Sequence, residues 1–136
     1  MDEREGEASR TTNLEDWVAK RLSCTAFEVF VQLRQGAERD VRIRNEKRGG
    51  GERVNFKLKP GEESFTVLRE GPKITASVEF ILIDSGISVR RGSGEIIIEA
   101  SIMLNDECEC GLESEGTLLT CAQFRKRALE DLLFKF

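Results

Sequence analysis

The chain has 136 residues, 39% of them hydrophobic, which is enough for one folded domain with a core but not for two independent ones. It contains no His and no Tyr, which excludes His-based catalytic triads, proton shuttles and metal ligands and favours a binding protein over an enzyme. The net charge of −4 is unevenly spread, because residues 1–16 carry −4, residues 34–59 carry +5 and residues 73–136 carry −4.

The N-terminal residues 1–12 are acidic and polar, so they are predicted to form a disordered tail ahead of a single domain, residues 13–136. They show no signal-peptide pattern, and no stretch of the chain is apolar enough to span a membrane, so we expect an intracellular location, in the nucleus, mitochondrion or cytoplasm. Asn13 is predicted to cap a short helix, and its apolar stripe should pack on a sheet. That stripe consists of Leu14, Trp17, Val18 and Leu22.

The next segments alternate between apolar and polar residues, which is typical of strands. TAFEVFVQLR (25–34), VRIRNEK (41–47) and VNFKLK (54–59) each follow this period of two, with Gln35–Gly36 and the glycines 49–51 as turns. The pattern predicts an antiparallel sheet with one apolar face and one basic face. Phe30, Arg42, Arg44, Lys57 and Lys59 are predicted to lie on the basic face.

Residues 60–71, PGEESFTVLREG, allow two interpretations. Pro60 in a first helical turn, Glu62 and Glu63 near the helix start and Gly71–Pro72 as a stop favour a helix. Pro60–Gly61 as a turn, followed by the β-branched Thr66 and Val67, favours a second strand of a hairpin. The helix is the preferred interpretation because it satisfies all of the first group of signals at once.

The second half shows the same order of elements. KITASVEFILID, SGISVRRGSG and EIIIEASIMLND are predicted strands, DECECGLESEG is a polar irregular segment, and the last 22 residues are a predicted amphipathic helix. The predicted fold class is therefore α+β, with a short N-terminal helix before two tandem modules of three or four antiparallel strands and a helix. The first module covers about 24–71 and the second about 73–136.

Several of these segments resemble single-stranded nucleic-acid-binding folds. ISVRRGSGEIIIEASIM and EGTLLTCAQFRKRALEDLL resemble the strands and helix of the positive-cofactor transcriptional coactivators, and ERVNFKLKPGEESFTVLREG resembles the last strand and helix of a Whirly repeat. FEVFVQLRQGAERDVRIRNEKRGGGERVNFKLK is similar to the opening strands of PUR repeats. The resemblance implies a paired four-strand-plus-helix fold, a single-stranded DNA or RNA partner and a homo- or hetero-oligomer.

The predicted function is non-enzymatic binding of single-stranded DNA or RNA, in transcription or RNA processing. Basic residues on alternate positions and in loops provide phosphate contacts, and an aromatic residue provides base stacking. The alternative is a protein-interaction or assembly subunit that contacts its partner through the acidic second half. The predicted nucleic-acid-binding residues are Phe30, Arg42, Arg44, Lys47, Arg48, Arg53, Lys57, Lys59, Arg90 and Arg91.

Four cysteines, at 24, 108, 110 and 121, have no spacing typical of a zinc finger. Cys24 and Cys121 fall at apolar positions of predicted elements. Free cysteines are therefore favoured over a metal site or a redox pair, and no metal or cofactor is expected.

Overall fold

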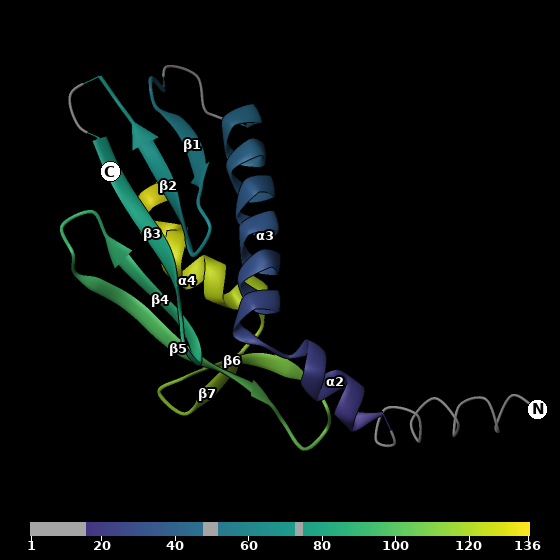
Figure 1. The fold of residues 1–136 in the computed structure, drawn as a ribbon. Helices are drawn as coiled ribbons and strands as arrows, with labels where there is room; N and C mark the ends of the chain where they lie inside the picture. The colour runs from purple at the N-terminus through teal and green to yellow at the C-terminus, as the bar shows by residue number, and fades with distance from the viewer. Residues whose placement is uncertain (1–15, 48–51, 73–74) are drawn as a thin grey trace, which may run out of the picture.

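The computed structural model describes residues 16–47, 52–72 and 75–136 and has an α+β fold (Figure 1). In these ranges, three helices accompany one seven-stranded antiparallel sheet. The elements are α2 (Trp17–Ser23), α3 (Ala26–Glu46), β1 (Asn55–Pro60), β2 (Ser64–Glu70), β3 (Thr75–Ile83), β4 (Gly86–Arg91), β5 (Ile96–Leu104), β6 (Cys110–Ser114), β7 (Thr117–Leu119) and α4 (Cys121–Phe134).

The sheet is a meander in which each strand pairs with the next along the chain. All six pairings are antiparallel, and the register shifts between Val89 and Arg90 where β4 meets β5. Such a shift bends and twists the strands locally. β1 and β7 are the edge strands.

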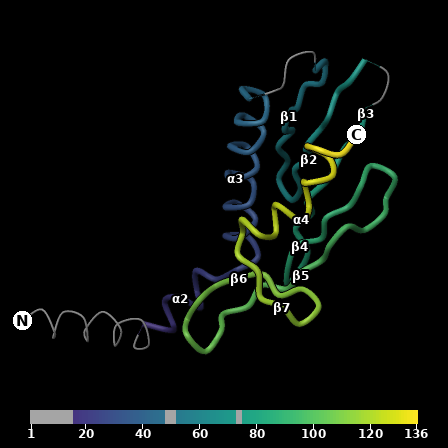
Figure 2. The backbone as a smooth tube through the Cα atoms, turned by 180° about the vertical axis from the view of Figure 1, so that it is seen from behind, coloured from purple at the N-terminus to yellow at the C-terminus, as the bar shows by residue number. Residues whose placement is uncertain are grey.

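Helices α3 and α4 cover the same face of this sheet, and the core lies between them and the strands (Figures 1 and 2). Four fully buried phenylalanine rings cross this core from α3 through β2 and β3 to α4. Their centroids are separated by 5.4, 4.5 and 6.2 Å in that order, within the range in which aromatic pairs stabilise one another. The rings belong to Phe30, Phe65, Phe80 and Phe124.

Residues 26–46 form one long helix, so the two strands predicted from TAFEVFVQLR and VRIRNEK are wrong. The segment also carries apolar residues at helical spacing, and α3 buries Phe30, Leu33, Ala37 and Val41 while Phe27 is exposed. Most of its other residues are strong helix formers, and the hydroxyl of Thr25 accepts a hydrogen bond from the backbone N–H of Glu28 to cap the helix. The apolar residues of 25–34 therefore fit both the strand period of two and the helical period, and the fold uses the helical one.

The segment after Pro60 is strand β2, so the preferred helix was wrong and the hairpin alternative was correct. β2 pairs with β1 on one side and with β3 on the other. Phe65 lies directly opposite Phe80 of β3, with stacked rings, and both are fully buried. This partner is distant in sequence, and its burial outweighs the local helix signals.

The two-module arrangement is not confirmed, because the first half runs from a helix into strands and not from strands into a helix. The predicted start of the N-terminal helix at Asn13 is not confirmed, because residues 1–15 lie outside the described ranges. Within those ranges α2 begins at Trp17, and it does not dock on the sheet: it has no buried residue. α2 instead projects from the body of the protein (Figure 1).

The predictions for the other strands and the last helix agree better with the structure. β1, β3, β4 and β5 lie in the segments predicted as strands, and α4 lies in the predicted C-terminal helix. The polar segment expected to be irregular contributes β6, and Thr117–Leu119 forms β7 where the helix was expected to have begun. Thr120 and Gln123 form a reciprocal capping box, which sets the start of α4.

The free edge of β1 is closed by α3 through Asn45. The side-chain amide of Asn45 donates to the carbonyl of Phe56 at 2.8 Å and accepts from its N–H at 3.0 Å. An edge strand with unpaired backbone groups invites pairing with another chain. Asn45 therefore both holds α3 beside β1 and blocks this edge at Phe56.

Candidate functional site

Helices α3 and α4 run in the same direction and are joined by several side-chain contacts. The thiol of Cys121, at the start of α4, donates to the side-chain oxygen of Gln32 of α3 at 3.7 Å. Near their ends, Nε of Arg44 donates to the carbonyl of Leu133 at 2.9 Å. Both contacts join residues 89 apart in sequence, which places the two helices side by side in the same direction.

The guanidinium of Arg125 of α4 lies directly against Gly36 of α3. A Cβ atom at position 36 would overlap the guanidinium of Arg125, so a larger residue there must displace this side chain. Nε of Arg125 donates to Oδ2 of Asp40 at 2.8 Å, and the arginine side chain is largely buried. This ion pair therefore joins the two helices at the groove described below.

Substituting Gly36 by Ala is expected to destabilise the protein, although Ala is the better helix former by about 1 kcal/mol. The added methyl group displaces Arg125 from Asp40, and losing a hydrogen bond between charged groups costs about 1.5–3 kcal/mol. In an Arg125→Ala background the clash is absent, so Gly36→Ala should then stabilise by about 1 kcal/mol. Urea unfolding of the unchanged protein, the two single variants and the double variant measures the effect of Gly36→Ala on stability in each background. An effect of the same sign in both backgrounds would contradict the predicted contact.

The two helices enclose an open groove of about 450 Å³ that includes this ion pair and is called the α3–α4 groove below. Its apolar wall is not covered, since Ile43 is 43% and Phe134 65% exposed. Exposed apolar side chains gathered in a hollow are typical of a binding surface. The groove is lined by Asp40, Ile43, Arg44, Lys47, Ala122, Arg125, Lys126, Leu129, Glu130, Leu133 and Phe134.

The charges around the α3–α4 groove are mainly positive. Four of the lining residues are basic and two are acidic. Asp40 is already paired with Arg125, whereas Lys47 and Lys126 form no ion pair with any other described residue. The unpaired charges at the groove are therefore Lys47, which directly follows α3, and Lys126 and Glu130 of α4, so cations outnumber acidic groups among them.

Arg44, predicted to bind phosphate, is buried and forms part of the groove wall. Besides its bond to Leu133, its Nη2 lies 2.9 Å from Oε2 of Glu52, and its guanidinium lies 5.1 Å from the ring centroids of both Phe56 and Phe134. These contacts hold the guanidinium within the fold. Arg44 is a structural residue and not a surface cation.

The other predicted nucleic-acid-binding residues do not form one face. Phe30 is fully buried in the core, so it cannot stack on a base. Arg42 and Lys47 are exposed on and just after α3, Lys57 and Lys59 are exposed on β1, and Arg90 is exposed on β4. Arg53 is exposed before β1, Arg91 pairs with Glu95 and Asp131, and Arg48 lies outside the described residues.

The apolar residues of the groove were missed by the sequence analysis. Ile43 was assigned to the inward face of a strand, whereas it lies on the open side of α3. Phe134 was not among the residues assigned to the apolar stripe of the predicted last helix. Nothing in either segment reveals that the two helices lie together, so the groove had no local signal.

A second hollow lies between β3, β4 and the end of α4 and is polar. Its positive side chains are engaged: Arg91 and Lys135 both pair with Asp131, and Arg69 donates to the carbonyl of Leu132 at 2.9 Å. Cations at this position balance the unsatisfied carbonyls and the negative dipole at the end of a helix. This hollow is therefore explained by the capping of α4.

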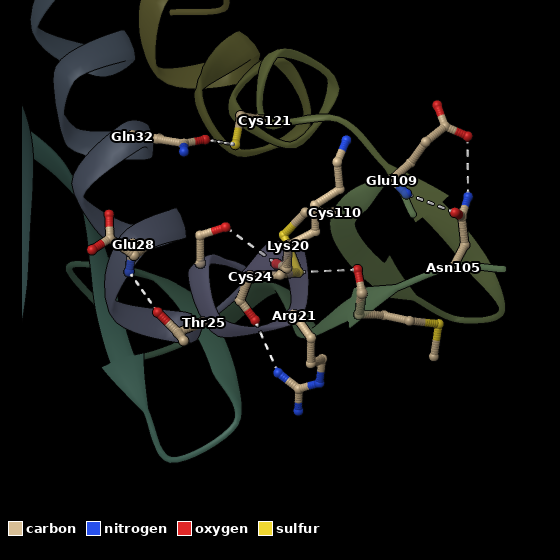
Figure 3. The surroundings of a disulfide bond; sticks show 12 residues. Lys20, Arg21, Cys24, Thr25, Glu28, Gln32, Asn105, Glu109, Cys110 and Cys121 are labelled. Atoms are coloured by element: carbon tan, nitrogen blue, oxygen red, sulfur yellow. Dashed lines mark hydrogen bonds between the residues drawn. A yellow bond between two sulfur atoms is a disulfide. The ribbon is translucent and has the colours of Figure 1, made fainter. Parts of the chain in front are cut away.

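Cys24 and Cys110 form a disulfide, which corrects the prediction that all four cysteines are free (Figure 3). Cys24 directly follows α2, and Cys110 begins β6. The guanidinium of Arg21 donates to the carbonyl of Cys24 at 3.2 Å, which further fixes the junction of α2 and α3. Residues 86 apart in sequence carry no local sign that they will meet.

Cys121 is a free thiol at the start of α4. Burial raises the pKa of the Cys121 thiol above its ordinary value, and the positive charge of Arg125 opposes this shift. Since the thiolate is the reactive form, we expect iodoacetamide to label Cys121 slowly at neutral pH and faster as the pH rises. Peptide mapping by mass spectrometry over a pH series measures the labelling rate, with the urea-unfolded chain as reference. Equal labelling rates of Cys121 in the folded and the unfolded chain at neutral pH would refute the prediction.

Neither a metal site nor a membrane-spanning helix is found in the described ranges. No group of three His, Cys, Asp or Glu side chains there is arranged to hold a metal ion. None of the helices described is long and apolar enough to cross a membrane. In comparisons with known proteins, no protein-family model, no curated protein and no solved structure matches the chain.

Proposed function

We propose that this chain is a non-enzymatic protein-interaction module that binds an amphipathic helix of a protein partner in the α3–α4 groove. The observation that carries this proposal is the uncovered apolar wall at Ile43 and Phe134, flanked by the unpaired cations Lys47 and Lys126. Covering apolar surface stabilises a complex by about 25 cal/mol for each Å² removed from water. An open groove between two parallel helices is a geometry that accepts a third helix.

The charges narrow the class of partner. A helix that fits has apolar residues at positions i, i+3, i+4 and i+7 for the groove wall, and acidic residues on its flanks for Lys47 and Lys126. Complementary charges at the rim mainly speed association and set the orientation, while the apolar contacts hold the complex together. The surface differs from the acidic second half that the sequence suggested, because α3 belongs to the first half.

A designed helical peptide with leucines at this spacing and glutamates elsewhere tests the proposal. Fluorescence anisotropy should show it binding the protein, and the same peptide with its leucines replaced by serine should not bind. Ile43→Asp should weaken binding by about tenfold or more, equivalent to 1.4 kcal/mol or more, because it places a charge in the apolar wall. Ile83→Asp, an exposed isoleucine at the end of β3, is the matched control and should bind as the unchanged protein does.

Two outcomes of this experiment would reject the groove as the binding site. One is the absence of binding by the leucine peptide at low salt. The other is equal binding by the Ile43→Asp and Ile83→Asp proteins, since the contact would then lie elsewhere.

Binding of single-stranded DNA or RNA is the second candidate function. It is favoured by exposed cations that pair with no acidic residue in the described part of the chain, namely Arg42, Lys47, Arg53, Lys59 and Arg90. The ligand would be of the class that the Whirly, positive-cofactor and PUR families bind, although the chain does not show their repeat. Phe30 is buried and is not available to stack on a base. This candidate ranks second because the cations are distributed over three elements and a loop.

Filter binding to single-stranded oligonucleotides across a salt series tests this candidate. Phosphate contacts predict that log K falls linearly with log salt, with a slope of about −0.7 for each contact to a single strand. The double charge reversal Arg53→Glu with Lys59→Glu should make the slope shallower. The charge reversal Lys20→Glu on α2 is the control and should leave the slope unchanged. Binding that is absent, or that does not depend on salt, rejects nucleic acid as the partner.

A further inference from the structure

The first half of strand β5 has a free edge. β5 pairs with β4 from Ile96 to Ser101, whereas its pairing with β6 on the other side begins only at Ser101. The tight turn after β6 explains this difference, because Glu115 and Gly116, with φ of 50° and 81°, lead back into β7 and end β6 at Ser114. Residues 96–100 therefore reach beyond β6 and β7 and, among the described strands, pair with β4 only (Figure 1).

The backbone of this edge is suited to pairing with a further strand. The N–H of Ile102 donates to the carbonyl of Ser85, just before β4, at 2.9 Å. Backbone groups of alternate residues point to the same side of an antiparallel strand, so Ala100 also points to β4 and Glu99 points to the free edge. A row of N–H and C=O groups without a neighbouring strand is a template for another chain. Residues 96–100 offer about 17 Å of such edge at about 3.3 Å per residue.

The outer edges of the sheet offer less room for a further strand. Asn45 of α3 covers β1 at Phe56. β7 is three residues long and is followed at once by the cap of α4. The first half of β5 is therefore the most accessible edge among the described strands.

Side chains around the free edge form a partly apolar hollow of about 450 Å³. Ile96 is 48% exposed, and Ile97 and Ile98 are half-buried. Three consecutive isoleucines favour an extended backbone, because β-branched side chains pack well on a pleated surface. The hollow is lined by Ile96, Ile97, Ile98, Glu99, Ser114, Glu115 and Arg127.

The charges beside the free edge are mainly negative. Glu99, Glu113 and Glu115 form no ion pair with any other residue in the described ranges, and neither does Arg127. Glu113 lies opposite Ser101, two residues from Glu99, so both carboxylates lie on the same face of the sheet. Three free carboxylates thus stand against one free guanidinium.

This charge disfavours a second copy of the chain as the added strand. Two β5 edges paired antiparallel about Ile97 place Glu95 of each copy opposite Glu99 of the other, and like charges directly opposite destabilise a strand pair. Other antiparallel registers still bring together two edges that both carry a surplus of carboxylates. A segment with basic side chains has the complementary charge.

We propose that the free edge of β5 binds an extended basic segment of another protein, which adds a strand to the sheet beside residues 96–100. In this binding mode main-chain hydrogen bonds provide affinity and alternate side chains provide specificity. Basic side chains of the segment lie on the face of Glu99 and Glu113, and its apolar side chains lie on the face of Ile98. The inference goes beyond the proposed function, since the hollow shares no lining residue with the α3–α4 groove and has the opposite charge.

A labelled seven-residue peptide that alternates lysine and valine tests the proposal. Fluorescence anisotropy should show it binding at low salt, and the same peptide with its backbone nitrogens methylated should not bind, because it cannot pair with a strand. Hydrogen exchange of the Glu99 amide, followed by NMR, should slow on binding, since this N–H then donates to the peptide. Absence of binding, equal binding by the methylated peptide or an unchanged exchange rate overturns the proposal.

Variants of Glu99 then locate the site. Glu99→Pro removes the edge donor, and proline is tolerated where the N–H of a strand faces solvent. We expect this variant to keep the circular dichroism of the unchanged protein and to bind the peptide at least tenfold more weakly. Glu99→Lys should also weaken binding by reversing the charge, which keeps the site testable if the proline variant does not fold. Glu62→Lys, at the exposed turn between β1 and β2, is the matched control and should bind normally.

Three further outcomes separate this site from the alternatives. Equal binding by the Glu99→Lys and Glu62→Lys proteins would place the peptide elsewhere and overturn the proposal. A dimer of the unchanged protein that Glu99→Pro abolishes would make a second copy the occupant, which overturns the basic partner. Ile43→Asp, in the α3–α4 groove, should bind the lysine–valine peptide normally, and a loss of binding in this variant would show that the peptide lies in the groove.

Discussion

Replacing Phe80 with Ala is expected to lower the free energy of unfolding by about 3–5 kcal/mol, the range for truncating a buried phenylalanine. Phe80 is fully buried, stacks on Phe65 at 4.5 Å and contacts the edge of Phe124 at 6.2 Å. Its removal leaves a cavity between the sheet and α4 and also breaks two aromatic pairs, each worth about 0.5–1.5 kcal/mol. Urea unfolding followed by circular dichroism measures the loss.

The control for this variant is Phe27→Ala. Phe27 lies on α3 but is exposed, so its truncation should change the stability by no more than about 0.5 kcal/mol. Phe80→Leu, which keeps part of the volume, should fall between the two. Similar losses for Phe27→Ala and Phe80→Ala would contradict the position of Phe80 at the centre of the core.

Substituting Cys24 by Ser is expected to lower the free energy of unfolding by about 2–4 kcal/mol. The Cys24–Cys110 bond closes a loop between residues 86 apart, which includes α3 and the first five strands. Without the bond the unfolded chain has far more conformations, and this entropy favours unfolding. Thermal or urea unfolding of both proteins under oxidising conditions measures the difference.

Reduction provides an internal control for the Cys24 variant. Dithiothreitol should lower the stability of the unchanged protein to about that of Cys24→Ser, and it should leave the variant unaffected. Cys108→Ser, which removes a free thiol two residues before Cys110, should keep the stability of the unchanged protein in oxidising buffer. A reductant effect that persists in Cys24→Ser would mean that a different bond is involved.

The strands β1, β3, β4 and β5 and the helix α4 could be predicted because their signals are local. Along β3, for example, Val78 and Phe80 are buried in the alternating order expected of a sheet with one covered face. In α4, Ala128, Leu129 and Leu132 are buried at the predicted helical spacing. For these elements the pattern of burial and the local propensity agree.

The candidate site could be predicted only in part. Lys47 was selected as a functional cation and does lie at the groove, but the reason given, a basic sheet face, was wrong because its segment is helical. Arg44 was selected for its charge, whereas its guanidinium is paired within the fold with Glu52 and with the carbonyl of Leu133. Charge in a sequence does not reveal whether a partner inside the fold already neutralises it.

The amino-acid sequence by itself determined that this is an α+β protein, that its later strands form an antiparallel sheet and that the chain ends in an amphipathic helix. These properties follow from side-chain periodicity, which every short segment carries within itself. Tertiary structure alone decided that residues 26–46 are helical, that Phe65 lies in a strand against Phe80, that Cys24 meets Cys110 and that two helices enclose a groove. Each of these depends on partners far apart along the chain, whose packing energy is larger than the local preferences that opposed it.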